Sequence, residues 1–144
     1  MSIKPITVLV ADDNPTDIMI MREAFATTKV RMTIHAVSDG VEALEFLRRM
    51  GPYAQAPRPD LLLLDLNMPR KNGHEVLAEV KSDESLRTIP VVMLTTSQNE
   101  DDIAKAYESN VNCYIRKPVD FDKFTSVVNN IEQFWFTIVS LPTS

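Results

Sequence analysis

The stretch Leu61-Leu62-Leu63-Leu64-Asp65-Leu66-Asn67-Met68-Pro69 decides the fold. Four consecutive leucines lead into an acid, and a proline follows that acid four residues later. A short apolar run between chain breakers favours a strand that is buried on both faces, although periodicity alone does not exclude a buried helix segment. In open α/β sheets, the loops at the carboxyl ends of the strands form the binding crevice. We therefore expect Asp65 to lie at that edge of a sheet.

Apolar, β-rich segments alternate with segments of helical periodicity on both sides of this stretch. Besides the leucine run, strands are predicted at Ile6–Ala11, Met32–Val37, Ile89–Thr95 and Val111–Arg116. Helices are predicted over about 15–28 with Asn14 as cap, from Asp39 with Glu42 as a capping box, from Asn72 with Glu75, from Ser97 to about Ser109, and from Asp120 onward. Five strands alternating with five helices predict an α/β fold, with a parallel sheet that is covered on both faces. The proline-rich segment 51–59 is predicted to be a surface loop.

The composition indicates an ordinary globular protein with one domain. The chain has 144 residues, of which 44% are hydrophobic and 24% charged. Its net charge of −5 argues against non-specific binding to nucleic acid or to anionic membranes. Cys113 is the single cysteine, so no intrachain disulfide can form, and neither a signal peptide nor a membrane span is apparent. We expect a cytoplasmic protein with one domain over 1–144, a core at about 5–135 and an apolar tail at 136–144.

Three acids directly follow predicted strands. Asp12 and Asp13 come after the first strand, and Asp65 comes after the leucine run. If those two strands are neighbours, the three carboxylates meet in one crevice, where like charges need a cation. An oxygen-only cluster favours Mg²⁺, and the absence of nearby His or Cys argues against zinc. The alternative is that each acid only caps a helix or solvates a loop.

Two further strand ends carry polar groups toward the same edge. Thr95 ends the predicted fourth strand and offers a hydroxyl, and Lys117 follows the fifth and offers an ammonium group. Together with the three acids, they describe a site for phosphoryl transfer to a carboxylate. Asp65 would be the nucleophile and would form an acyl phosphate.

These residues resemble the receiver domain of two-component response regulators, over most of the chain. The matching pieces are Asp12-Asp13, Asp65-Leu66-Asn67-Met68-Pro69, Gly73, Thr95 and Tyr114-Ile115-Arg116-Lys117-Pro118. The resemblance implies a flavodoxin-like, doubly wound (βα)5 sandwich with strand order 2-1-3-4-5. It also implies that Asp65 accepts a phosphoryl group from a sensor histidine kinase. Asp13, Asp65 and the backbone carbonyl of Asn67 would ligate Mg²⁺, and Asp12 would help through water.

The resemblance assigns the remaining strand ends to a conformational switch. Thr95 and Tyr114 would be the switch pair, and Lys117 would contact the phosphoryl group. Thr95 could move toward the new phosphoryl oxygens and vacate space for the Tyr114 ring, which alters the face of the fourth and fifth helices. The Lys117–Pro118 bond resembles the cis peptide of receivers. Thr96 stands where Ala or Gly is frequent, which leaves the lifetime of the phosphoryl group open.

A closer resemblance is to the stand-alone regulators that partner cyanobacterial phytochromes. It rests on the loop at 51–59, Leu94-Thr95-Thr96-Ser97, Asn112-Cys113-Tyr114 and the ending Phe134-Trp135-Phe136-Thr137-Ile138-Val139-Ser140-Leu141-Pro142. One helical stripe cannot bury three consecutive aromatic residues, so either the tail folds back or a partner covers it. The resemblance implies a phytochrome as kinase and a homodimer through Phe134, Trp135, Phe136 and Leu141. Any downstream contact would be made to another protein.

Two other functions share this residue set. A metal-dependent phosphatase or phosphotransferase also uses an aspartyl phosphate, but it typically places the nucleophile after the first strand, with a second acid two residues on. A receiver-like interaction module could act without phosphate, although the intact set of acids speaks against it. A nucleotide-binding α/β protein is disfavoured because the three glycines form no phosphate-binding motif.

Overall fold

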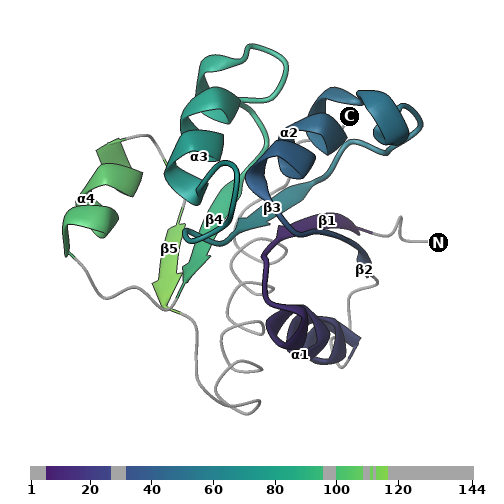
Figure 1. The fold of residues 1–144 in the computed structure, drawn as a ribbon, viewed down its shortest axis with the longest axis horizontal. Helices are drawn as coiled ribbons and strands as arrows, with labels where there is room; N and C mark the ends of the chain where they lie inside the picture. Colours follow the sequence, from purple (N-terminus) through teal and green to yellow (C-terminus); the bar gives the residue numbers. More distant parts are fainter. Residues whose placement is uncertain (1–5, 27–31, 96–99, 109–110, 112, 117–144) are drawn as a thin grey trace, which may run out of the picture.

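The computed structural model describes residues 6–26, 32–95, 100–108, 111 and 113–116, with the backbone alone for 94–95 and 113–116. Strands and helices alternate along these residues (Figure 1). The strands are β1 (Ile6–Ala11), β2 (Met32–Val37), β3 (Leu61–Leu64), β4 (Val91–Thr95) and β5 (Cys113–Arg116). The helices are α1 (Pro15–Ala26), α2 (Gly40–Arg48), α3 (Gly73–Ser82) and α4 (Glu100–Glu108), with a 3₁₀ turn η1 (Gly51–Tyr53) after α2.

The five strands form one parallel sheet in the order β2-β1-β3-β4-β5. This confirms the predicted fold class and strand order. Ala11, the last residue of β1, pairs with Val37 on one side and with Leu64 on the other. Two backbone hydrogen bonds continue the pairing beyond the strands: Asp12 N–H donates to the Val37 carbonyl at 3.0 Å, and Asp65 N–H donates to the Ala11 carbonyl at 2.9 Å. The residues after β1 and after β3 therefore begin at the same edge of the sheet.

The leucine run contributes side chains to the hydrophobic cores on both faces of the sheet. Successive side chains of a strand point to opposite faces. Leu62 and Leu64 accordingly pack in the core under α2 and α3, and Leu61 and Leu63 pack in the core under α1. None of the four is more than 1% exposed, so both faces of β3 are buried. Figure 1 shows these layers, with α1 on one face of the sheet and α2, α3 and α4 on the other.

The helix starts confirm most of the predicted caps. The Asn14 carboxamide accepts the N–H groups of Thr16 and Asp17, at 2.9 and 3.3 Å. Asn72 and Glu75 form the complete reciprocal capping box of α3. Asp39 accepts the Glu42 N–H at 2.8 Å and caps α2.

Of the two hydrogen bonds of the predicted capping box at the start of α2, the described residues show only the one from the Glu42 N–H to the Asp39 carboxylate. The Glu42 carboxylate instead accepts the hydroxyl groups of Ser38 and Tyr53, each at 3.3 Å.

Three element boundaries differ from the sequence prediction. β4 begins at Val91 rather than Ile89, because the Ile89 N–H closes a turn onto Leu86 and Pro90 has no N–H to donate. β5 begins at Cys113 rather than Val111, because the Val111 N–H caps the end of α4 through the Ala106 carbonyl. The loop at 51–59 contains the η1 turn. The predicted extension of α1 to residue 28, the cap at Ser97 and the helix from Asp120 lie outside the described residues.

No helix in the described part of the chain is both long and apolar enough to cross a bilayer.

Candidate functional site

Asp12, Asp13 and Asp65, here called the acidic cluster, lie together at the carboxyl edge of the sheet. One carboxylate oxygen of each lies within 4.8 Å of the corresponding oxygens of the other two. Asp12 is fully buried and Asp65 is 7% exposed, while Asp13 is exposed. Three carboxylates this close repel one another unless a cation or a proton joins them. The juxtaposition expected from the sequence is therefore present.

Asp12 is held by the start of α1. Its carboxylate accepts the Asn14 N–H at 2.9 Å, which closes an Asx turn directly after β1. Asn14 in turn caps α1 with its own side chain. The buried carboxylate is thus oriented by the same short segment that leads the chain from strand to helix.

Asp65 is held by close packing of α3 against the backbone that follows β3. The Gly73 N–H donates to the Leu66 carbonyl at 2.7 Å. A Cβ atom at Gly73 would lie 2.5 Å from the Asp65 carbonyl oxygen and 2.8 Å from the Leu66 Cα. Only glycine allows this approach. The exposed Asn67 lies in the same loop, two residues after Asp65.

The rest of the β3–α3 loop is braced against the start of α2. Arg70 adopts a left-handed backbone conformation, with φ of 67°, inside a turn in which the Lys71 N–H donates to the Pro69 carbonyl at 2.8 Å. Its guanidinium pairs with the buried Asp39 carboxylate at 3.2 Å. A Cβ atom at Gly40 would overlap the Lys71 carbonyl oxygen. Two close backbone contacts, at Gly73 and Gly40, therefore fix the loop that follows Asp65.

Sequence reasoning missed this brace. Asp39 was interpreted only as a helix cap, and Gly40, Arg70 and Lys71 were not singled out. Nothing in the local pattern indicates a left-handed arginine, or a contact between residues 31 positions apart. The one usable signal is Gly40, a poor helix former at the first position of a predicted helix.

Helices α3 and α4 meet at a buried histidine. His74 is 7% exposed, and its Nε2 lies 3.5 Å from an Asp102 carboxylate oxygen. Neither ring nitrogen makes a hydrogen bond to a described residue. The 3.5 Å approach satisfies an ion-pair distance but not hydrogen-bond geometry, so Asp102 is a neighbour of His74 rather than a strong partner.

The other predicted site residues are only partly described. The backbone places Thr95 at the end of β4, two residues beyond Met93, which pairs with the last residue of β3. Tyr114 lies in β5 opposite Met93. Lys117, the predicted cis bond to Pro118, and the tail residues Phe134, Trp135, Phe136 and Leu141 lie outside the described residues.

The donor set of the acidic cluster fits a hard divalent cation. All the ligand atoms are carboxylate oxygens, two of the three residues are buried, and the three can converge on one ion. Mg²⁺ and Mn²⁺ both accept such oxygens.

Comparison with known proteins agrees with this geometry. The family model for the response regulator receiver domain matches residues 8–129. The response regulator Rcp1 of Synechocystis is 42% identical over 140 residues, which are 97% of this chain and 95% of Rcp1. A probable methanogenesis regulatory protein, FilR2 of Methanothrix harundinacea, is 39% identical over 132 residues, covering 91% of this chain and 84% of FilR2.

Two solved structures have nearly the same fold. The phosphorylated cyanobacterial phytochrome response regulator RcpA superposes with a TM-score of 0.92 at 47% identity, covering 97% of this chain and all of the RcpA chain. The Mn²⁺-bound form of Rcp1 gives a TM-score of 0.90 at 42% identity, covering 96% of this chain and all of that chain. The range matched by the family model includes Asp12, Asp13 and Asp65. The chain therefore belongs to the response regulator receiver family and is a phosphoacceptor signalling module.

Proposed function

We propose that this chain is a single-domain response regulator in which Asp65 is the phosphoacceptor. The observation that carries the proposal is the position of Asp65 at the end of a strand buried on both faces, with the carboxylates of Asp12 and Asp13 within 4.8 Å. Asp13 is exposed, so the cluster opens to solvent on one side. A donor can reach the site there, while the buried side keeps Asp65 in one orientation.

The proposed reaction moves one phosphoryl group from a phosphohistidine of the kinase. A carboxylate oxygen of Asp65 attacks the phosphorus, the P–N bond breaks, and its electron pair stays on the imidazole, which then takes up a proton. The product on this chain is an acyl phosphate. Because Gly73 and Gly40 anchor the surrounding backbone, Asp65 is positioned before the donor arrives.

Within this proposal, Mg²⁺ is held by the carboxylates of Asp13 and Asp65 and by the Asn67 carbonyl, with Asp12 acting through water. The oxygen-only donor set and the Mn²⁺-bound form of the relative Rcp1 support this assignment. A bound divalent cation neutralises charge on the transferring group. Lys117 is proposed to contact the same oxygens.

Thr95 and Tyr114 are proposed to convert the new charge into a changed surface. Thr95 ends β4 beside β3, and Tyr114 lies in β5 opposite Met93. An acyl phosphate on Asp65 adds about −1.5 to −2 charge near the end of β4, by analogy with other phosphorylated side chains. Movement of Thr95 toward that charge and of Tyr114 into the vacated space would alter the face formed by α4 and the helix predicted from Asp120.

The proposed kinase is a phytochrome, and the proposed assembly is a homodimer. Support for the kinase comes from RcpA, a cyanobacterial phytochrome response regulator that is 47% identical to this chain. Support for the dimer comes from the consecutive aromatic residues Phe134, Trp135 and Phe136, followed by Leu141. The proposal treats 1–144 as one cytoplasmic domain with a core over 5–135, and 136–144 as the apolar tail that joins two copies.

Intact mass spectrometry tests the central claim. The protein and its Asp65→Asn variant are incubated with Mg²⁺ and acetyl phosphate. The wild type is expected to gain the mass of one phosphoryl group, and the variant is expected to gain none. An adduct of equal yield on Asp65→Asn, or no adduct on the wild type in any divalent metal, would refute the assignment.

The kinase and the dimer need separate readouts. Phosphotransfer from a phytochrome-type histidine kinase should be faster than transfer from an unrelated histidine kinase at equal concentration. Equal rates would remove the phytochrome claim and leave the phosphoacceptor claim intact.

Light scattering on wild type and Trp135→Ala should give dimer and monomer masses, and equal masses would remove the proposed dimer contact.

A further inference from the structure

A pocket of about 330 Å³ lies at the amino edge of the sheet, opposite to the acidic cluster. The end of α2, the loop before β3 and the turn before β4 form its walls. Its lining consists of three arginines, two leucines and one serine: Leu47, Arg48, Arg49, Arg58, Ser85 and Leu86. None of the described residues that line this pocket is an acid. We call it the arginine pocket.

Arg58 and Arg49 are held in place by neutral acceptors. The two terminal nitrogens of Arg58 donate to the Ser85 carbonyl at 2.6 Å and to the Thr88 hydroxyl at 2.9 Å. The Arg49 Nε donates to the Ala56 carbonyl at 3.0 Å. A guanidinium has five N–H donors, so both side chains keep donors for a further acceptor. Neither pairs with a carboxylate anywhere in the residues that the structure describes.

Arg48, by contrast, has its charge compensated by two acids. It pairs with Glu79 at 3.4 Å and with Asp83 at 3.8 Å, while Lys71 also binds Glu79. The hydroxyl and the N–H of Ser85 donate to Asp83, which lowers the pKa of that carboxyl group and keeps it ionised near neutral pH. The positive charges of Arg48 and Lys71 are thus compensated by Glu79 and Asp83. The charges of Arg49 and Arg58 are not compensated by these acids.

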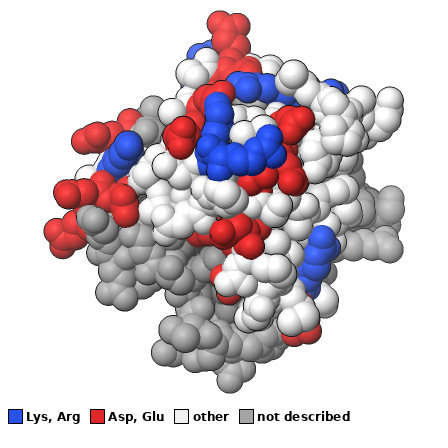
Figure 2. Space-filling model, in the orientation of Figure 1, with Lys and Arg blue, Asp and Glu red and all other residues white. Residues whose placement is uncertain are grey.

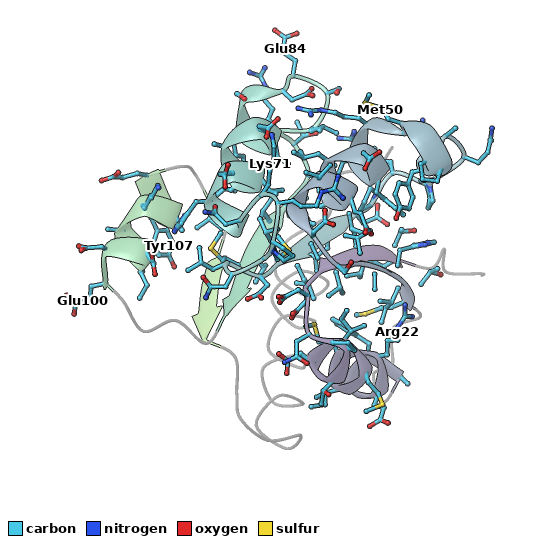
Figure 3. The ribbon with its side chains drawn as sticks, viewed as in Figure 1. Arg22, Met50, Lys71, Glu84, Glu100 and Tyr107 are labelled. Carbon is cyan, nitrogen blue, oxygen red and sulfur yellow. The ribbon has the colours of Figure 1, made fainter. Side chains whose placement is uncertain are left out.

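Three other acids lie near this edge: Glu45, Asp60 and Glu84. None of them forms an ion pair with Arg49 or Arg58 in the part of the chain that the structure describes, and the Asp60 carboxylate accepts the Thr7 N–H at 2.9 Å. Figure 3 shows Glu84 at the top of the view, pointing away from the fold. Glu45 lies one helical turn before Arg49 but makes no ion pair with it within 4.0 Å. Figure 2 shows the wider setting: basic side chains gather with acids over α2 and α3, whereas acidic side chains dominate over α4.

Arg49 adopts a left-handed backbone conformation, which glycine and asparagine adopt more readily than arginine. It follows α2 with φ of 55°, and its N–H caps the helix through the carbonyls of Glu45 and Phe46. Glycine or asparagine usually occupies such a left-handed position, because a Cβ atom is unfavourable there. Arg49 therefore has a backbone conformation that glycine would adopt at lower cost, and this makes its side chain a candidate for a functional role. The same side chain lines the pocket and keeps N–H donors available there.

We propose that the arginine pocket binds a small organic oxyanion between Arg49 and Arg58. The planar guanidinium fork matches the oxygens of a phosphate or a carboxylate. Leu47 and Leu86 line the pocket and are only 8% and 3% exposed, so apolar contact to a short stem would come from their small exposed parts and from the methylene groups of the arginines. The volume of about 330 Å³ lies at the lower end of the range for small-molecule sites. This binding requires neither Asp65 nor a metal ion.

NMR titration of the full-length ¹⁵N-labelled protein tests the proposal. The buffer is Tris chloride freed of divalent cations, so that the acidic cluster has no metal to attract an anion. Inorganic phosphate, phenyl phosphate and benzoate are added in separate titrations. We expect saturable shifts of the Arg49 Nε–H signal and of amides in 47–58 and 83–88. Phenyl phosphate should bind more tightly than inorganic phosphate if the leucines contribute, and the ratio of benzoate to phenyl phosphate distinguishes a carboxylate ligand from a phosphate ligand.

Substitutions separate binding from folding. Arg58→Gln and Arg49→Gly should each weaken binding about tenfold, the effect of losing one hydrogen bond to a charged group. Arg49→Gly should also raise the melting temperature, because glycine suits the left-handed position, so its weaker binding cannot come from unfolding. Arg22→Gln is the matched control, since Arg22 also donates to a backbone carbonyl, that of Ile34 at 3.2 Å, but lies on α1.

Three results would overturn the proposal. The first is the absence of saturable shifts with all three anions. The second is equal affinity in wild type, Arg58→Gln and Arg49→Gly. The third is loss of the shifts in Asp65→Asn, which would place the anion at the acidic cluster instead.

Discussion

An acidic cluster lies at one edge of the sheet and a pocket lined by arginines lies at the other, and the two sites are built in different ways. At the carboxyl edge, Asp12, Asp13 and Asp65 converge within 4.8 Å, and two of them are buried. At the amino edge, Arg48, Arg49 and Arg58 line an open pocket with exposed side chains. The backbone around the acids is fixed by close packing, and the Asp12 carboxylate also accepts the Asn14 N–H, whereas the arginine side chains are fixed by hydrogen bonds to carbonyl, hydroxyl and carboxylate groups. Substitutions at the carboxyl edge should therefore cost stability as well as function, and substitutions at the amino edge should mainly cost binding.

Each edge also contains one left-handed arginine, and these two are the only non-glycine residues with positive φ in the described chain. Arg70 pairs with the buried Asp39, so its charge is used inside the fold. The Arg49 guanidinium donates to the Ala56 carbonyl and pairs with no carboxylate among the described residues. The same backbone strain thus accompanies a structural contact at one edge and an available cation at the other.

The largest expected effect is that of Gly73→Ala at the carboxyl edge. The added Cβ would lie 2.5 Å from the Asp65 carbonyl oxygen, so α3 or the strand end must move. We expect a loss of about 3 kcal/mol in the free energy of unfolding, at the upper end for overpacking. Urea denaturation measures it. Ala78→Gly is the control for helix propensity, because Ala78 is exposed on α3 and should lose only about 1 kcal/mol. Equal losses would show that the close approach at Gly73 is not required.

Asp13→Asn tests whether the acidic cluster is a metal site. Without metal, removing one of three like charges should leave the protein as stable as the wild type, or more stable. With Mg²⁺ at about 100 times its dissociation constant, the wild type should gain about 2.7 kcal/mol and the variant much less. Thermal melts with and without Mg²⁺ measure both effects. Asp17→Asn, an acid on α1 outside the cluster, is the control and should keep the full Mg²⁺ effect.

Asp39 combines two roles that substitutions can separate. Its carboxylate caps α2 through the Glu42 N–H and pairs with Arg70. Asp39→Asn keeps a capping oxygen but loses the charge, while Asp39→Ala loses both. We expect Asp39→Ala to cost about 1–2 kcal/mol and Asp39→Asn less, because asparagine caps nearly as well as aspartate. If both variants lose the same free energy in urea denaturation, the Arg70 pair rather than the cap accounts for the contribution of Asp39.

The sequence predicted what is encoded locally and missed what depends on the packing of separate loops. The leucine run predicted a doubly buried strand because four apolar side chains alternate between two faces. Asn72 and Glu75 predicted a capping box because both partners lie in one turn. The sequence prediction began β4 two residues too early, at Ile89, because the apolar segment begins there. Strand pairing begins only at Val91, since Pro90 has no N–H to donate.

The contact between Arg70 and Asp39, which braces the β3–α3 loop, could not be predicted in this way, and neither could the arginine pocket. Arg70 and Asp39 are 31 positions apart, and Arg58 and Ser85 are 27 positions apart. Each contact needs the finished sheet to bring two loops together. The acidic cluster spans an even longer separation, yet it was predictable. The difference is that strand ends of a parallel sheet share an edge by topology, while a loop-to-loop contact follows from no such rule.

The smallest expected effect concerns Glu79, which connects the two edges. Figure 3 shows Lys71, from the loop after Asp65, where α2 and α3 face each other. Lys71 and Arg48 both bind the Glu79 carboxylate, and the Lys71 hydrogen bond is the main cause that lowers its pKa below the ordinary value of 4.5. A lowered folded-state pKa means that the contribution of Glu79 to stability is complete above pH 4.5. It is lost as the pH falls through the lower folded-state value.

Glu79→Gln should therefore destabilise the protein at pH 7 by less than about 1 kcal/mol, since the ion pairs are partly exposed and screened by solvent. The difference from the wild type should shrink as the pH falls below 4.5, and it should also shrink in high salt. Glu84→Gln is the control, because Glu84 points away from the fold (Figure 3) and should change stability little at any pH. If Glu79→Gln also alters anion affinity in the arginine pocket, freed Arg48 contributes to that site. If it leaves the affinity unchanged, Arg49 and Arg58 alone bind the anion.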